Sequence, residues 1–166
     1  MQQGQGELME LRSPAFPDRG SMPKRFAGEG GNVSPPLSWD GLPAGTKSLV
    51  LIVEDIDIPL PKFLLRTWVH WVVVDIPPES RGLPEGIARN GLVPGGGVQG
   101  RTSYLRPGWG GPAPVGGEHR YVFKLFALDC MMGLPARKAT KAALVARMEG
   151  HVLAEAALVG RYARQR

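Results

Sequence analysis

The feature that most constrains the fold of this chain is an unbroken apolar run at residues 48–53, Ser-Leu-Val-Leu-Ile-Val. Polar residues do not alternate with apolar ones along this run, which is typical of a β-strand that is covered on both faces. The chain contains 23 Gly and 16 Pro residues, which separate this run from the other apolar segments. Because they follow no period and form no low-complexity tract, they indicate a loop-rich β fold.

Further strands are predicted around this central one. Residues 67–74 form a second core strand, and residues 121–128 form the last long strand. Residues 8–11 form a short first strand. The paired prolines of residues 33–39 cannot donate hydrogen bonds to a sheet, so this segment is expected to be an extended edge segment.

The rest of the chain divides into an irregular part and a C-terminal part. Residues 79–117 are dominated by Gly and Pro, and an irregular segment of this length inside a compact domain is usually functional or disordered. Residues 137–149 and 152–163 are rich in Ala, Leu and Arg, with Gly150 between them as a break. Their apolar spacing predicts two C-terminal helices, so the fold class is β-rich α+β.

Length, charge and cysteine content limit the classes of protein to which the chain can belong. One domain is expected over residues 1–166, with flexible ends at 1–7 and 165–166. The net charge is +5, but no recognised binding motif accompanies it, so nucleic acid is not an expected partner. No apolar stretch is long enough to span a membrane. With Cys130 as the one cysteine and no signal peptide, a cytoplasmic location is expected.

Acidic and imidazole side chains lie at the ends of the predicted strands. Asp55 follows the central strand, His70 lies in the second core strand, and His119 precedes the last one. We expect these three residues to meet in one pocket. A carboxylate beside two imidazoles can raise their pKa and hold an anion, or it can exchange protons with a bound molecule. An anion-binding site and an acid/base site are therefore both open.

Several short motifs occur in a characteristic order along the chain. They are NVSPPLSW at 32–39, DIDIP at 55–59, VHW at 69–71, GRTSY at 100–104, GP at 111–112, HRY at 119–121, ALD at 127–129, GHVLA at 150–154 and LVGRY at 158–162. In this combination the chain resembles the phosphatidylethanolamine-binding protein family, in particular its bacterial, Raf kinase inhibitor-like branch. The resemblance covers nearly the whole chain.

This resemblance implies an antiparallel Greek-key β-sandwich with flanking helices. It also implies a small pocket at one edge that binds anions and phosphorylated head groups. Carried over to this chain, the pocket residues are Asp55, Pro59, Trp68, His70, Gly111, Pro112, His119 and Tyr121. The resemblance offers no support for a zinc site at the Asp and His residues, and no metal or cofactor is expected.

The favoured function is therefore that of a protein that binds a small phosphorylated or anionic ligand and modulates a kinase or another protein partner. By resemblance to bacterial relatives, the chain is expected to form a homodimer, with Trp109 and the Pro- and Gly-rich loops as its apolar surface. A third possibility is an inhibitor that acts through protein contacts alone.

The main alternative is a biosynthetic enzyme. Ile56 and Ile58 replace the Pro and Ala that are usual in the family and make the pocket rim more apolar. Asp55, His70 and His119 would then catalyse a cyclisation, isomerisation or dehydration of a small apolar metabolite.

Two further expectations concern the residues beside the pocket. The resemblance predicts that the Ile58–Pro59 peptide bond is cis, because the family turns sharply at this point. Asp57 is expected to point away from Asp55, and Arg120 away from His119, because neighbouring residues of an extended segment face opposite sides. Arg120 is thus a candidate partner for a structural ion pair.

Overall fold

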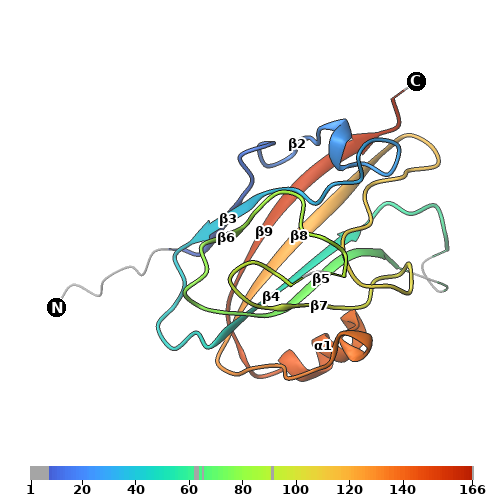
Figure 1. Cartoon of the computed structure of the whole chain (residues 1–166). Coiled ribbons are helices and arrows are strands. Elements are labelled where there is room, and N and C mark those ends of the chain that lie inside the picture. The colour runs from blue at the N-terminus through green and yellow to red at the C-terminus, as the bar shows by residue number, and fades with distance from the viewer. Residues whose placement is uncertain (1–7, 62–63, 65, 91, 166) are drawn as a thin grey trace.

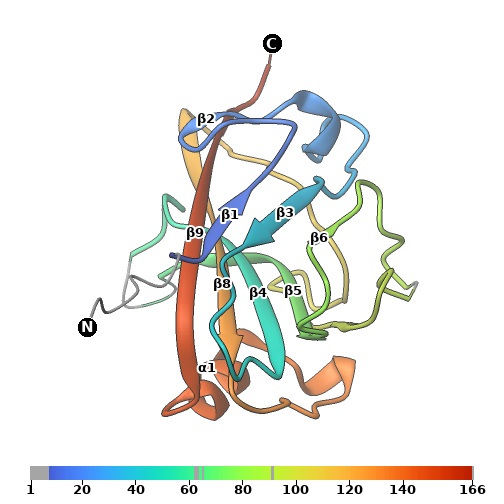
Figure 2. The same ribbon diagram turned by 90° about the vertical axis from the view of Figure 1, so that its left-hand side faces the viewer.

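Two β-sheets contain most of the regular secondary structure (Figures 1 and 2). The computed structural model of the chain describes residues 8–61, 64, 66–90 and 92–165. The large sheet contains, in spatial order, β2 (Gly20–Ser21), β9 (Val152–Ala163), β8 (Glu118–Leu128), β4 (Ser48–Asp55), β5 (Trp68–Ile76) and β7 (Val98–Gln99). The small sheet contains β1 (Glu10–Arg12), β3 (Leu37–Asp40) and β6 (Gly82–Leu83). Neighbouring strands are antiparallel except β2 and β9, which are parallel.

Strand β4 is the centre of the large sheet. It pairs with β5 along one edge and with β8 along the other, and all eight of its residues are buried. Leu49, Leu51 and Val53 belong to the core between the two sheets, whereas Val50 and Ile52 belong to a second core on the other face. The prediction of a strand that is covered on both faces is confirmed.

The second core lies under the C-terminal helix. Leu144 and Met148 of α1 (Lys141–Met148) pack with Val72 and Val74 of β5 on the face of the large sheet that the small sheet leaves free. Figure 1 shows α1 against one end of this sheet. Full burial of each such aliphatic side chain contributes about 1.5–3 kcal/mol, so these contacts fix the helix to the sheet.

Of the two predicted C-terminal helices, the first is present and the second is wrong. The first predicted helix is present but short: Thr140 caps α1 by accepting a hydrogen bond from the backbone N–H of Ala143, and the short 3₁₀ helix Ala136–Lys138 precedes it. The second predicted helix is strand β9, which pairs with β8 along nearly its whole length.

Alternate burial explains why residues 152–163 form a strand. Ala154, Ala156, Leu158 and Tyr162 pack into or against the core between the sheets, as expected when every second residue of a strand faces the same side. The pairing with β8 satisfies the backbone along the strand, and this tertiary context overrides the high helix propensity of Ala and Leu.

The segment at 33–39 also differs from its prediction. Its strand, β3, is the middle strand of the small sheet, paired with β1 and β6, and is not an edge. The strand begins at Leu37, directly after the second proline, so neither proline has to donate to the ladder.

Outside the sheets, regular structure is sparse, as predicted for residues 79–117. In the part of this segment that is described, strands are limited to β6 and β7.

No helix among the described residues is long and apolar enough to cross a membrane. The predicted flexible ends lie outside the described residues, except Gln165, whose backbone N–H donates to Glu29 (2.9 Å). The Greek-key connection and the single domain stay predictions.

A buried ion pair anchors the start of α1 to the central strand. Glu54 of β4 is 2% exposed and accepts hydrogen bonds from Lys141 (2.5 Å) and Thr67 (2.7 Å), and Lys124 lies 3.5 Å away. Burial alone would raise the pKa of Glu54, but these hydrogen bonds and lysine charges outweigh it and lower the pKa. The carboxylate is therefore ionised and depends on its partners.

We predict that Lys141→Met destabilises the protein. Loss of one partner from a buried ion pair costs about 3–5 kcal/mol, and Lys124 keeps the loss near the lower end, about 3 kcal/mol. Urea denaturation of the wild type and the variant measures this change in the free energy of unfolding. Lys138→Met, which removes the same charge from an exposed position, is the control. Equal stability of the two variants would contradict the anchoring role of Lys141.

Candidate functional site

Strand register brings the candidate residues to one end of the large sheet. Asp55 is the last residue of β4 and lies opposite Trp68 of β5 on one side and Tyr121 of β8 on the other. His70 lies two residues after Trp68 in β5, and His119 lies two residues before Tyr121 in β8. Because residues two apart in a strand face the same side, the histidines and Asp55 converge as predicted.

Asp55 and His119 form a buried hydrogen-bonded pair. Nδ1 of His119 donates to Oδ2 of Asp55 over 2.7 Å, and both side chains are less than a tenth exposed. Oδ1 of Asp55 accepts the backbone N–H of Asp57 (2.8 Å), while Nε2 of His119 lies 3.2 Å from the carbonyl oxygen of Gly116. Both carboxylate oxygens therefore have donors, which offsets the cost of burying the charge.

His70 has a different environment from His119. Its ring is 1% exposed, and its Nδ1 donates to the carbonyl oxygen of Gly110 over 2.5 Å. The rings of Tyr104 and Tyr121 contact it edge-on, at centroid distances of 5.7 and 5.1 Å. Burial lowers the pKa of His70 despite the opposing effects of the Gly110 carbonyl and the Asp55 charge. His70 is therefore a neutral imidazole near pH 7, and the expectation that the carboxylate raises the pKa of both imidazoles is wrong for His70.

A cavity of about 270 Å³ opens beside these residues. Its lining residues are Asp55, Ile58, Pro59, Trp68, His70, Tyr104, Ala113, Pro114, Val115 and His119. Five of the eight residues predicted from the sequence are among them. Gly111, Pro112 and Tyr121 are not: they are buried around the cavity, with Tyr121 beneath the ring of His70.

The sequence prediction missed one side of the cavity. Tyr104 belongs to the GRTSY motif, which was noted without a role, and its ring lies edge-on to both Trp68 and His70. Ala113, Pro114 and Val115 directly follow the predicted Gly-Pro pair. Their position next to this pair was the available signal, but apolar loop residues carry no chemical pattern that marks them as lining a site.

The backbone N–H groups of Gly110 and Gly111 are not available to a ligand, because both donate hydrogen bonds within the protein. The backbone N–H of Gly110 donates to the carbonyl oxygen of His70 (3.0 Å), and that of Gly111 donates to Oδ1 of Asn32 (2.7 Å). A Cβ atom at Gly111 would collide with the backbone at Phe26, so the glycine serves close packing. These two N–H groups therefore do not contribute anion contacts at this site.

The turn after β4 forms without the predicted cis bond. The Ile58–Pro59 peptide is trans, so this prediction is wrong. The chain turns because Asp55 accepts the backbone N–H of Asp57. Asp57 in turn receives hydrogen bonds from both the backbone and the guanidinium of Arg120, at 2.8–2.9 Å. The structural ion pair expected for Arg120 is present.

Tyr121 places a buried hydroxyl next to the site without lining the cavity. Within the described part of the chain, this hydroxyl is the one fully buried side-chain polar atom without a hydrogen-bond partner. Burial and the nearby charge of Asp55 raise the pKa of Tyr121, so it stays protonated. An unsatisfied buried hydroxyl costs about 1–3 kcal/mol.

A second hollow of about 350 Å³ adjoins the first. The two share Tyr104 and Ala113 as a common wall. Arg106 and Arg164 line the second hollow, and the guanidinium of Arg106 lies 5.4 Å from the ring centroid of Tyr104. The two arginines outnumber Glu29, the carboxylate that also lines this hollow, so positive charge is available next to the cavity. Among the described residues, no arginine or lysine lines the cavity itself.

Comparison with known proteins identifies the family. The sequence profile described as phosphatidylethanolamine-binding protein matches residues 12–163. The chain belongs to the phosphatidylethanolamine-binding protein family. A UPF0098 protein of Methanothermobacter thermautotrophicus is 47% identical over 156 residues, which cover 94% of this chain and 99% of that protein. A UPF0098 protein of Aquifex aeolicus is 40% identical and covers 96% and 91%.

Solved structures of this family have the same fold. A homologue from Chlamydia trachomatis, CT736, superposes with a TM-score of 0.86 at 36% identity and covers 95% of this chain and 99% of its own. YbcL of Escherichia coli gives a TM-score of 0.83 at 29% identity and covers 96% and 100%. The fold predicted from the resemblance is therefore confirmed at the level of the family.

The surface proposed for dimerisation needs correction. Trp109 is 1% exposed, and its Nε1 donates to the carbonyl oxygen of Phe26 (2.9 Å). It stacks inside the core against Phe123 and cannot contribute to an interface. The homodimer itself stays a prediction.

The neutral state of His70 leads to a prediction about stability and pH. The pKa of His70 in the folded protein lies below its ordinary value of 6.5. Below pH 6.5 the unfolded chain binds a proton that the folded chain does not, so the free energy of unfolding falls as the pH falls. The slope is at most about 1.4 kcal/mol per pH unit and ends once the pH passes the folded pKa.

This contribution is measured by comparing the wild type with His70→Gln, which keeps a side-chain donor, by urea denaturation between pH 4.5 and 8. The other histidines are common to both proteins and cancel in the difference. The wild type should lose more stability than the variant between pH 6.5 and 5. Parallel curves would show that His70 is not held neutral.

Proposed function

We propose that this protein binds a small molecule that carries a phosphate or another anionic group. Membership of the phosphatidylethanolamine-binding protein family supports ligand binding. The observation that carries the proposal is a 270 Å³ cavity in which apolar walls adjoin the buried Asp55–His119 pair. This volume is below the usual range of drug-sized pockets, about 300–1,000 Å³, and suits a molecule the size of a lipid head group.

Charge balance suggests how such a ligand would lie. Asp55 offsets any positive charge on His119, and His70 is neutral, so the described lining of the cavity offers an anion little net attraction. Arg106 and Arg164, which outnumber the carboxylate of Glu29 in the second hollow, supply this attraction. In this proposal the anionic group lies near Tyr104, between the hollows, and the rest of the ligand packs against Trp68 and Ile58.

This arrangement predicts that Arg106→Gln weakens binding of O-phosphorylethanolamine. A charge-assisted hydrogen bond contributes about 1.5–3 kcal/mol, and the exposure of Arg106 reduces this to about 1 kcal/mol, or about fivefold in affinity. Calorimetric titration at pH 7 measures the effect. Arg137→Gln, an equal change of charge on the 3₁₀ helix beside α1, should leave the affinity within about twofold. Failure of the wild type to bind, or equal weakening by both substitutions, would contradict the proposal.

The enzyme alternative has its own supporting observation. A hydrogen-bonded carboxylate–imidazole pair lies beside the neutral His70 and the apolar side chains of Ile58 and Val115. Such a pair can accept and return a proton during the isomerisation or dehydration of an apolar metabolite. In this role Asp55 would orient His119, and the ring of His119 would act as the base.

Turnover separates the two functions. The protein is incubated with a small-molecule cell extract at a concentration well below that of the metabolites, and mass spectrometry follows their amounts. Binding alone removes at most one equivalent per chain, whereas an enzyme consumes many. Consumption by the wild type that is lost in Asp55→Asn would favour the enzyme.

We further propose that the protein is cytoplasmic, forms a homodimer, and modulates a protein kinase or another protein partner. The thiol of Cys130 is free, which suits a reducing compartment.

A further inference from the structure

A second cluster of reactive side chains lies where β8 and β9 meet, next to the loop that carries α1. Asp129 and Cys130 directly follow the last residue of β8, and His151 directly precedes β9. The backbone N–H of Asp129 donates to the carbonyl oxygen of His151 over 3.1 Å, which holds the ends of the loop 129–151 together. The function proposed above uses none of these residues.

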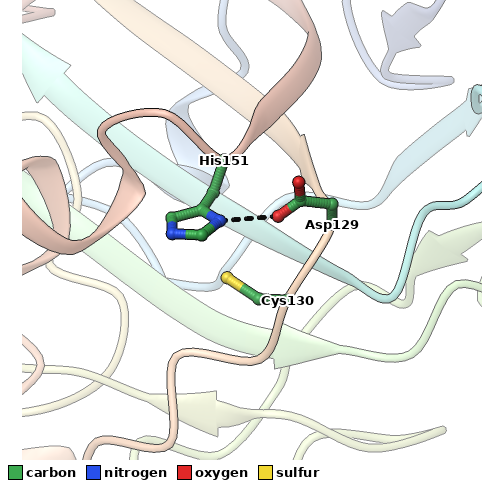
Figure 3. A group of neighbouring side chains, drawn as sticks. All are labelled: Asp129, Cys130 and His151. Atoms are coloured by element: carbon green, nitrogen blue, oxygen red, sulfur yellow. Dashed lines mark hydrogen bonds and ion pairs between the residues drawn. The ribbon is translucent and has the colours of Figure 1, made fainter.

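The three side chains are directed toward one another (Figure 3). Nδ1 of His151 lies 2.7 Å from Oδ1 of Asp129, and one ligand atom from each of the three residues lies within 4.8 Å of the other two. In the described part of the chain, this is the one group of three or more His, Cys, Asp or Glu residues with such spacing. Asp55, His70 and His119 of the cavity do not meet this criterion.

The backbone of the cluster is fixed on both sides. Oγ of Ser48 donates to the carbonyl oxygen of Cys130 over 2.5 Å, which ties the residue to β4. The backbone N–H groups of Met132 and Gly133 donate to the carboxylate of Asp75 at 2.7 and 3.0 Å, which ties the next residues to β5. The cysteine is therefore presented from a fixed backbone.

The electrostatic surroundings argue against a nucleophilic cysteine. Partial burial and the negative charges of Asp129 and Asp75 raise the pKa of the Cys130 thiol, and the positive charge of Lys47 opposes them. Reactive cysteines have a lowered pKa, so this thiol is not suited to nucleophilic catalysis. The same negative surroundings attract a divalent cation, which can displace the thiol proton.

We propose that Asp129, Cys130 and His151 bind one zinc-type divalent cation. The sulfur, nitrogen and oxygen donors are those that Zn²⁺ accepts, whereas Ca²⁺ and Mg²⁺ prefer oxygen alone. Metal–ligand bonds of about 2.0–2.3 Å place the donor atoms of a tetrahedral site about 3.3–3.8 Å apart. Side-chain rotations that move the ligand atoms by about 1 Å therefore complete the site. Side chains of Asp129 and His151 are 44% and 46% exposed, so water can fill the fourth position.

Binding would join the ends of β8 and β9 at the base of the loop that carries α1. A cation that binds the folded chain in preference to the unfolded one raises the midpoint temperature of thermal unfolding. The cavity lies at the opposite end of β8 and is separate from this site. Ligand binding in the cavity and cation binding here can therefore be tested independently.

The test is a titration of the untagged, full-length protein with Zn²⁺ and, for its spectrum, with Co²⁺, after treatment with a chelator and a phosphine reductant. We expect one equivalent to bind with micromolar or tighter affinity and to raise the midpoint temperature. Co²⁺ should produce a thiolate-to-metal charge-transfer band. Since the chain has one cysteine, this band can arise only from Cys130.

Variants identify the ligands. Cys130→Ser should abolish the charge-transfer band, and Cys130→Ser and His151→Gln should each weaken Zn²⁺ binding at least tenfold. Glu149→Gln, which removes an exposed carboxylate beside the site, is the control and should change neither. The proposal is overturned if the wild type binds no stoichiometric Zn²⁺, if bound Co²⁺ gives no thiolate band, or if Cys130→Ser keeps the wild-type affinity. The spectrum of the wild type decides the matter even if a variant does not fold.

Discussion

The double-sided burial of β4 is the constraint on which the rest of the structure depends. Because the strand pairs along both edges and packs on both faces, its register with β5 and β8 has no freedom to slip. That register fixes the position of Asp55 between Trp68 and Tyr121. The candidate site thus lies at the end of a strand that is buried along its whole length, while loop residues such as Pro59 and Val115 supply part of its walls.

The polar residues at the end of β4 serve two different purposes. Glu54 faces α1 and is neutralised by lysines, which fixes the helix to the sheet. Asp55 faces the cavity and forms a buried hydrogen-bonded pair with His119. Neighbouring carboxylates of one strand therefore have different surroundings: one anchors the helix, and the other lines the candidate site.

The sequence predicted the parts of the fold that depend on local pattern. The central strands and the convergence of Asp55, His70 and His119 followed from apolar runs and strand ends. Residues 152–163 were predicted as a helix because Ala and Leu favour helices, whereas pairing with β8 decides the outcome. The use of the Gly110 and Gly111 N–H groups by His70 and Asn32 depends on tertiary contacts that no local pattern encodes.

A crystal structure with O-phosphorylethanolamine bound tests the central claim most directly. We predict density for the ligand in the cavity beside Trp68 and His119, with its phosphate near Tyr104 and within reach of Arg106. We also predict that His70 keeps its hydrogen bond to Gly110. A ligand found elsewhere on the protein, or a cavity that stays free of ligand at saturating concentration, would contradict it.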